Sequence, residues 1–337
     1  MTPEASPGIR PAPLLGLLAL ATLVMTAISI AVGYAPLPLG QAVSDLIAGQ
    51  KSLPALVLYE LRLPRALLGA LVGFSLGMAG AAMQGLLRNP LAEPGVIGIS
   101  SAAAFGAVLA FYSGLSASLA LALPLGGIAG ALVATVILFI LLGRGASTTT
   151  LILAGVALNS FAGAATALAL NLAPNPYAAL EIVFWLMGSL ADRSMNQVAL
   201  VLPLMLLGWA SLASTAPALD ALGLGEDTAA SLGFHLVWLR ARLIGGAALA
   251  VGSAVAVTGA IGFVGLVVPH LLRPLVGHRP GRLLIASGFG GAILVLAADI
   301  GVRLMPIRPE LKLGVVTALI GAPFLFALVQ RLRREAV

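Results

Sequence analysis

Long apolar runs, separated by short stretches rich in glycine, proline or charge, make up most of this 337-residue chain. Most runs approach the about 20 residues that an α-helix needs to cross the hydrocarbon core of a bilayer. The pattern predicts ten membrane-spanning helices, over residues 14–34, 64–84, 98–115, 120–142, 150–171, 197–216, 240–260, 263–277, 283–304 and 312–330. The first run is too long for the core of a signal peptide, so we expect it to remain as an uncleaved span.

The eighth run, 263–277, differs from the others because it is short and contains Pro269. A proline inside a helix removes a backbone hydrogen bond and kinks or breaks the helix. Broken helices within a membrane occur where protein encloses them. We therefore predict a tilted or broken helix at this position.

Composition supports the same class of protein. Hydrophobic residues make up 60% of the chain and charged residues only 9%, whereas soluble domains are about a quarter charged. The chain contains no cysteine, which excludes disulfides and thiolate metal sites. We predict an all-α, polytopic membrane helix bundle that forms a single transmembrane domain over residues 1–337, with short broken or coupling helices between its spans.

The distribution of basic residues predicts the orientation, since cytoplasmic loops carry an excess of lysine and arginine. With the N-terminus inside and the spans alternating, eleven of the 18 basic residues fall on the inner face, including the C-terminal RLRR cluster. We therefore expect both termini in the cytoplasm. Seven cations remain on the outer face, namely Lys51, Arg62, Arg65, Arg193, Arg303, Arg308 and Lys312.

Two interpretations account for the outer arginines Arg62, Arg65 and Arg303. Acidic neighbours could neutralise them locally, with Asp299 one helical turn before Arg303, Glu60 beside Arg62, and Glu310 near Arg308. Surface pairs of this kind contribute little to stability. Alternatively, these arginines form a basic docking surface for an acidic partner outside the cytoplasm, because complementary charge steers and orients such a partner.

The stretch RNPLAEPG, residues 88–95, interrupts the helical pattern after the second run. Two prolines and a glycine so close together exclude a continuous helix. The segment, which carries Asn89 and Glu93, is either a cytoplasmic turn or a re-entrant segment between two spans.

Eight strings in order make the chain resemble one family: RLPR, AAMQGLLRNPLAEPGVIGISSAA, LAGVALNS, WLMGSL, LGLGEDTAASLG, GAIGFVGLVVPHLLR, AADIGVR and LGVVTALIGAPFLF. It resembles the FecCD-type permeases of ABC importers, which carry ferric siderophores, haem and cobalamin. The resemblance runs from about residue 55 to the C-terminus. It implies a homodimer of ten-span subunits in the bacterial inner membrane, with two cytoplasmic ATPase subunits and one periplasmic substrate-binding protein.

The resemblance also implies roles for particular residues. It assigns docking of the binding protein to Arg62, Arg65 and Arg303, the same arginines that the charge pattern singles out. It makes the polar segment of about 218–236 a pair of short helices that couple to the ATPase, with matching positions at Asp220, Gly225, Glu226, Ala229 and Gly233. The alternative for this segment is an ordinary solvated loop.

Two further inner-side strings match the family's cytoplasmic gate. The matching residues are Asn89 and Leu91 in RNPLAEPG, and Ser147 and Thr148 in GRGASTTTL. Ser147 is also well placed to be the N-cap of the fifth span, since a serine side chain there accepts from a free backbone N–H. Both roles are compatible.

The sequence says less about the cargo than about the family. We expect Met78 and Met83, small residues and few fixed charges to line the translocation path, which suits a large chelate. The general likeness favours haem, followed by a ferric siderophore and then cobalamin. The chain has no G-x-x-x-x-G-K-[ST] string, so we expect no cofactor on this chain itself, with ATP and Mg²⁺ on the partner ATPase.

Two other classes of function remain as alternatives. An ion-coupled secondary transporter needs ionisable residues at membrane depth, and Asp299 is the one acidic candidate that the runs place there. A membrane enzyme is disfavoured because His235, His270 and His278 form no close metal-ligand pattern. Besides its protein partners the chain is expected to contact lipid, and no nucleic acid.

Overall fold

The computed structural model describes residues 11–33, 36–143, 147–307 and 309–335. Every regular element in these ranges is helical. Two of the eleven basic residues assigned to the inner face, Arg10 and Arg144, lie outside the described residues. Arg308 and the first and last residues of the chain also lie outside them.

Among the described residues, eight helices are long and apolar enough to cross a membrane. Their bounds are α1 Pro11–Ala31, α4 Leu63–Leu87, α7 Ala122–Leu142, α8 Thr148–Asn171, α10 Met195–Ala213, α13 Leu236–Thr258, α15 Pro280–Leu304 and α16 Leu313–Glu335. Shorter elements connect them: α2 Leu39–Ile47, α3 Leu53–Leu56, η1 Val57–Arg62, η2 Pro94–Ile97, α5 Ile99–Tyr112, α6 Leu115–Ser118, α9 Pro176–Leu186, α11 Ala216–Leu222, α12 Glu226–Ser231, α14 Val264–Leu272 and η3 Pro274–Val276.

Each of the ten predicted runs contains a helix, but two of those helices are short. The run 98–115 forms α5, of 14 residues, and the run 263–277 forms α14, of nine residues, followed by η3. At 1.5 Å per residue these helices are about 21 and 14 Å long, which is less than the about 30 Å of a hydrocarbon core. The predicted break at the eighth run is confirmed, while the count of ten full-length spans is not.

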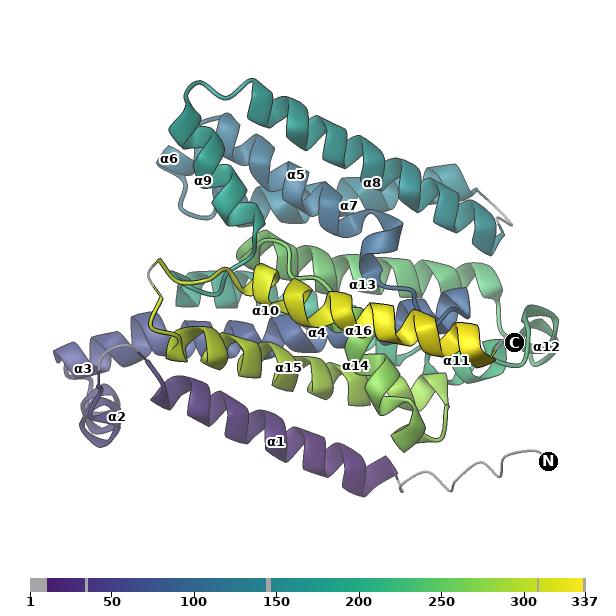
Figure 1. The fold of residues 1–337 in the computed structure, drawn as a ribbon, viewed down its shortest axis with the longest axis horizontal. Helices are drawn as coiled ribbons and strands as arrows, with labels where there is room; N and C mark the ends of the chain where they lie inside the picture. The colour runs from purple at the N-terminus through teal and green to yellow at the C-terminus, as the bar shows by residue number, and fades with distance from the viewer. Residues whose placement is uncertain (1–10, 34–35, 144–146, 308, 336–337) are drawn as a thin grey trace.

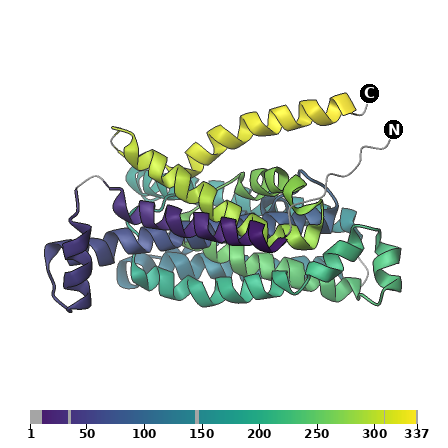
Figure 2. The same ribbon diagram turned by 90° about the horizontal axis from the view of Figure 1, so that it is seen from below.

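The long helices run side by side along the long axis of the molecule (Figure 1). One end carries α2 and α3, and we call it the α2 end. The opposite end carries α11 and α12, and we call it the α12 end. Figure 2 shows α16 leaning away from the other helices. Helix α1 begins, and α16 ends, toward the α12 end.

The centre of the bundle depends on close contact between α4 and α15. A Cβ atom added at Gly73 would lie 2.4 Å from the carbonyl oxygen of Gly291, and one at Gly77 would lie 2.0 Å from that of Ser287. Such distances are far inside van der Waals contact, so only glycine fits. Small residues at helix interfaces are the usual means of close approach in a membrane, where the hydrophobic effect does not drive helices together.

The helix that leads into α4 contains a wide π turn, η1, just before Pro64. Pro64 has no N–H, and its ring would clash with the carbonyl four residues earlier in a regular α-helix. The backbone N–H of Leu63 donates instead to Leu58, five residues back. The result is a nearly continuous helix over 53–87 that extends beyond the bundle at the α2 end.

Helices α5 and α14 both begin inside the bundle. A Cβ atom at Gly80, in the C-terminal half of α4, would lie 2.0 Å from the carbonyl oxygen of Gly265, and a Cβ atom at Gly265 would lie 3.0 Å from the side chain of Pro94. The Glu93 carboxylate accepts a hydrogen bond from the backbone N–H of Phe263, which joins the two breaks. Of the two interpretations of RNPLAEPG, the structure therefore favours the re-entrant segment.

Candidate functional site

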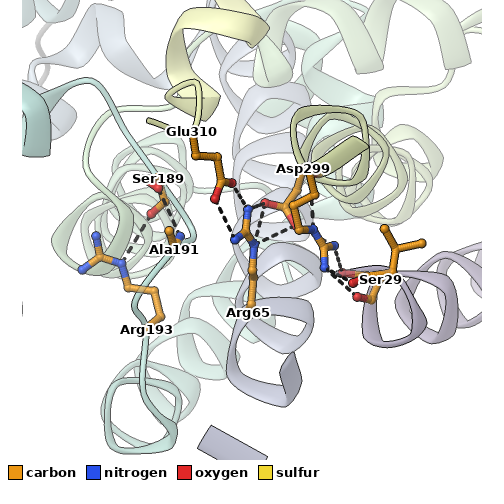
Figure 3. Close-up of polar contacts among 9 residues, drawn as sticks. Ser29, Arg65, Ser189, Ala191, Arg193, Asp299 and Glu310 are labelled. Carbon is orange, nitrogen blue, oxygen red and sulfur yellow. Dashed lines mark hydrogen bonds and ion pairs between the residues drawn. The ribbon is translucent and has the colours of Figure 1, made fainter. Parts of the chain in front are cut away.

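Arg65 and Arg303, at the α2 end, form one largely buried polar cluster with the acidic residues Asp299 and Glu310, and Figure 3 draws the contacts of this cluster. Asp299 on α15 accepts from Arg65 of α4 at 2.8 Å and pairs with Arg303 of its own helix at 2.8 Å. Glu310, in the segment before α16, forms a second ion pair with Arg65. A single carboxylate thus joins two arginines from two spans, and Arg65 joins both spans to the loop that follows α15.

Two of these arginines also hold the C-terminal end of α1. Arg62 donates to the carbonyl oxygens of Ile30 and Ala31 at 2.9 and 2.7 Å, while Arg303 donates to those of Ser29 and Val32 at 2.8 and 2.7 Å. The last carbonyls of a helix lack partners within it and carry partial negative charge. The arginines satisfy these carbonyls and fasten α1 to α4 and α15.

The structure therefore places Arg62, Arg65 and Arg303 near one another at the α2 end. The predicted neutralisation of Arg303 by Asp299 is confirmed. Glu310 pairs with Arg65, although it was assigned to Arg308, which lies outside the described residues. Arg62 and Arg303 are only 7% and 6% exposed, so in this single subunit their side chains face inward. Docking of a partner by these arginines stays a prediction.

Arg193 lies on the loop before α10 at the same end, and its role was not predicted. Its Nε atom donates to the carbonyl oxygen of Ser189 at 3.4 Å, and Figure 3 draws it beside the cluster. Burial lowers the pKa of the Arg193 guanidinium, and the neighbouring charge of Asp192 partly offsets that shift. The sequence indicated Arg193 only as one of the seven cations assigned to the outer face.

The segment 218–236 folds as the predicted pair of short helices, α11 and α12, at the α12 end. Gly225 and Gly233 adopt φ values of 120° and 87°, which favour glycine. Ala229 is fully buried, and Asp220 accepts from the backbone N–H of Gly281 at 2.8 Å, so both residues fasten the segment to the bundle. Their part in coupling stays a prediction.

Glu226 connects this segment to two spans. It accepts two 3.0 Å hydrogen bonds from Arg240 of α13, and the Thr148 hydroxyl at the start of α8 donates to it at 3.3 Å. A predicted gate residue and a predicted coupling residue are therefore in direct contact. The sequence does not reveal this contact, because the two residues are 78 positions apart.

The other gate residues form local turns. The Ser147 side chain accepts from the backbone N–H of Thr150 at 3.2 Å, which confirms its N-cap role. Asn89 accepts from the backbone N–H of Leu91 at 2.9 Å, so its side chain closes the turn after α4. A gating function for these residues stays a prediction.

Met78 and Met83 lie in the packed interior of this single subunit. They are 1% and 0% exposed because α4 is enclosed by α10, α13, α14 and α15. Both residues are part of the hydrophobic core. A place for them along the translocation path stays a prediction.

A cavity of about 470 Å³ lies where the two broken segments meet, level with the middle of α4. Its polar lining includes Glu93, Ser101 and Asn159, and the Ser101 hydroxyl donates to Asn159. Asp299 was the one deep acidic residue expected from the sequence. The structure adds Glu93 as a second deep acidic residue. The sequence did not indicate the depth of Glu93, because a re-entrant segment and a surface turn have the same composition.

Comparisons with known proteins identify the family. Residues 21–331 match the model of the FecCD transport family. The chain is 42% identical over 278 residues to the uncharacterized ABC transporter permease YvrB of Bacillus subtilis (strain 168), covering 81% of this chain and 78% of that one.

A second relative is the vitamin B12 import system permease BtuC of Salmonella typhimurium (strain LT2), at 40% identity over 281 residues, 82% of this chain and 85% of that one. A solved structure described as an inward-facing, metal-chelate type ABC transporter superposes with a TM-score of 0.82 at 32% identity, covering 95% of this chain and 99% of the other. The chain therefore belongs to the FecCD transport family and is a membrane permease, a transport component and not an enzyme.

Proposed function

We propose that this chain is the permease subunit of an ATP-driven importer that moves a metal chelate into the bacterial cytoplasm. The observation that carries the proposal is the likeness along almost the whole chain to a metal-chelate type ABC transporter. The Glu226 contacts support a mechanism in which an ATPase moves the segment 218–236, because the segment is linked directly to the starts of α8 and α13.

A corrinoid of the vitamin B12 kind is the first cargo to test, since the Salmonella relative is named for it. Haem, which the sequence predicted first, is the second, and a ferric siderophore is the third. All three are bulky chelates that a binding protein can deliver to a path with few fixed charges.

The working assembly contains a second copy of this chain, two ATPase subunits that bind ATP and Mg²⁺, and a substrate-binding protein outside the inner membrane. The buried arginine cluster supports a role in docking through its concentration of cations at the α2 end. An acidic partner would engage it by competing with Asp299 and Glu310 for the arginines.

The α12 end faces the cytoplasm in this proposal, and with it the start of α1 and the end of α16. A single cysteine placed at exposed Asp227 should react with a membrane-impermeant maleimide only in inverted vesicles. A cysteine at exposed Gln50, near the α2 end, should react only from the outside. The reverse labelling pattern would overturn the orientation.

The function is tested by uptake into proteoliposomes that hold the permease, its ATPase and its binding protein. We expect accumulation of cyanocobalamin that requires ATP and Mg²⁺ inside, with haem and a ferric siderophore measured in parallel. Uptake of haem or siderophore alone would keep the importer and change the cargo. Uptake driven by an ion gradient, unaffected by removal of the ATPase, would instead support a secondary transporter.

A further inference from the structure

A second cavity, of about 560 Å³, opens at the α12 end and is rich in positive charge. It lies between the end of α4, the turn between α11 and α12, the end of α14 and the start of α15. Its basic lining comprises Arg88, Arg273, His278 and Arg279. Asp220 is the one acidic side chain in this lining, and its Oδ1 atom already accepts from the backbone N–H of Gly281.

The three arginines have no carboxylate partner among the side chains that the structure describes. Arg273 is half-buried and donates to the neutral side chain of Gln84 at 2.5 Å, while its Nε atom is buried without a hydrogen-bond partner. Four basic residues line the cavity against a single carboxylate, so the cavity is complementary to an anion.

The backbone around the cavity supports the same conclusion. Arg88 and His278 adopt left-handed φ values of 47° and 61°, a region that residues other than glycine rarely occupy. Arg88 is the C-cap of α4, a position where a helix commonly ends on a left-handed residue. These turns place two basic residues at the rim of one cavity.

We propose that this cavity binds a phosphate group, supplied by the headgroup of an anionic phospholipid from the inner leaflet. Arginine matches phosphate oxygens with paired N–H donors, and basic pockets between spans at the cytoplasmic side are suited to anionic headgroups. A lipid is favoured over a free phosphate because exposed apolar residues adjoin the cations. Leu224 lines the cavity at 73% exposure, and Leu271 and Leu275 flank Arg273.

A lipid bound at this site would connect the segment 218–236 to the helices of the bundle. Asp220, Gly223 and Leu224 of the segment 218–236 form one wall, while α4, α14 and α15 form the others. A phosphate held between them bridges that segment to the core of the bundle.

The test uses the purified permease in nanodiscs, with retained lipid identified by native mass spectrometry during stepwise removal. We expect the wild-type protein to retain phosphatidylglycerol or cardiolipin over phosphatidylcholine. Arg279→Gln, at an exposed position that tolerates substitution, and Arg273→Gln should each weaken retention about five-fold, and the double variant about 25-fold. Arg282→Gln is the matched control, since Arg282 is exposed on the same helix turn outside the cavity lining.

A titration with inorganic phosphate separates the sources. Retained lipid that phosphate displaces supports the headgroup as the ligand. Phosphate binding that is lost in the double variant, without any lipid preference, supports the same site with a soluble phosphate ligand. Equal retention in wild-type and double variant overturns the proposal, as does a double variant that loses affinity only for the purified ATPase. That last result would assign the cavity to an acidic side chain of the partner.

Discussion

Asp299 is the carboxylate in the described spans that pairs with two arginines. It is 1% exposed and joins Arg65 to Arg303, while Arg303 in turn holds the end of α1. Removing one partner of a buried charge pair leaves the remaining charge uncompensated. The free-energy cost of that uncompensated charge exceeds the stabilisation that the intact pair provides.

We expect Asp299→Asn to destabilise the solubilised permease by about 3 kcal/mol, measured by thermal unfolding. Glu181→Gln is the control, because that carboxylate is exposed on α9. Unchanged stability of the Asp299→Asn protein would show that α1 is held by other contacts. Loss of transport with normal assembly, independent of the ATPase, would support ion coupling through this residue.

Glu226 tests the link between ATP hydrolysis and transport. Its pairing with Arg240 is partly exposed, so the interaction contributes about 1 kcal/mol. We expect Glu226→Gln to lower the uptake per ATP hydrolysed about five-fold, measured in proteoliposomes, while the fold and the ATPase binding persist. Its neighbour Asp227 is exposed, and Asp227→Asn should leave that ratio unchanged. An equal effect of both substitutions would deny Glu226 a special role.

At the scale of elements, the contact between α4 and α15 decides whether the bundle can form. Gly77→Ala places a methyl group 2.0 Å from a backbone carbonyl that cannot move without its helix. Overpacking of this kind costs about 1–3 kcal/mol or more, so we expect a lower yield of folded protein and a lower unfolding temperature. Gly245→Ala is the control, since nothing lies within 4 Å of that position on α13. We expect it to be neutral or slightly stabilising.

The helical elements were mostly predictable, and the departures share one cause. Apolar side chains have the same hydropathy whether they are buried in protein or in lipid. The short, buried helices α5 and α14 were therefore predicted as complete spans. Helix α9 was not predicted, since its 11 residues fall below the length of a span. Its start nevertheless carried a signal, Asn175 as N-cap followed by Pro176.

At the scale of the whole molecule, α8 and α16 expose much of their apolar surface, including Phe161, Leu319 and Phe326. A shallow apolar groove along α16 continues to Met187 and Ala260. In the proposed homodimer, part of this surface is covered by the second copy.

The absence of cysteine makes that arrangement directly testable. We expect Leu319→Cys to give a disulfide-linked dimer under mild oxidation in the membrane. Leu20→Cys, exposed on α1 at the edge of the bundle, should remain monomeric on the same gels. Cross-linking through Leu20 alone would place the interface on α1.

The sequence by itself determined the class of the molecule and its family. Sixty per cent apolar residues in long runs permit only a membrane helix bundle, and eight strings in a constant order resemble one kind of permease. It also singled out Arg62, Arg65 and Arg303, because cations on the outer face contradict the insertion rule. These are properties of composition and order, which do not depend on how distant segments meet.

Only the tertiary structure decided which residues pair. It turned the three arginines inward onto Asp299 and α1, brought Glu226 to Thr148, and placed Glu93 in the lining of a cavity level with the middle of α4. It placed Met78 and Met83 in the core and brought four basic residues to the lining of one cavity. The physical reason is that a side chain's partners, and hence its charge environment, come from segments tens to hundreds of residues away. Only the packing of glycine-lined helices brings those segments together.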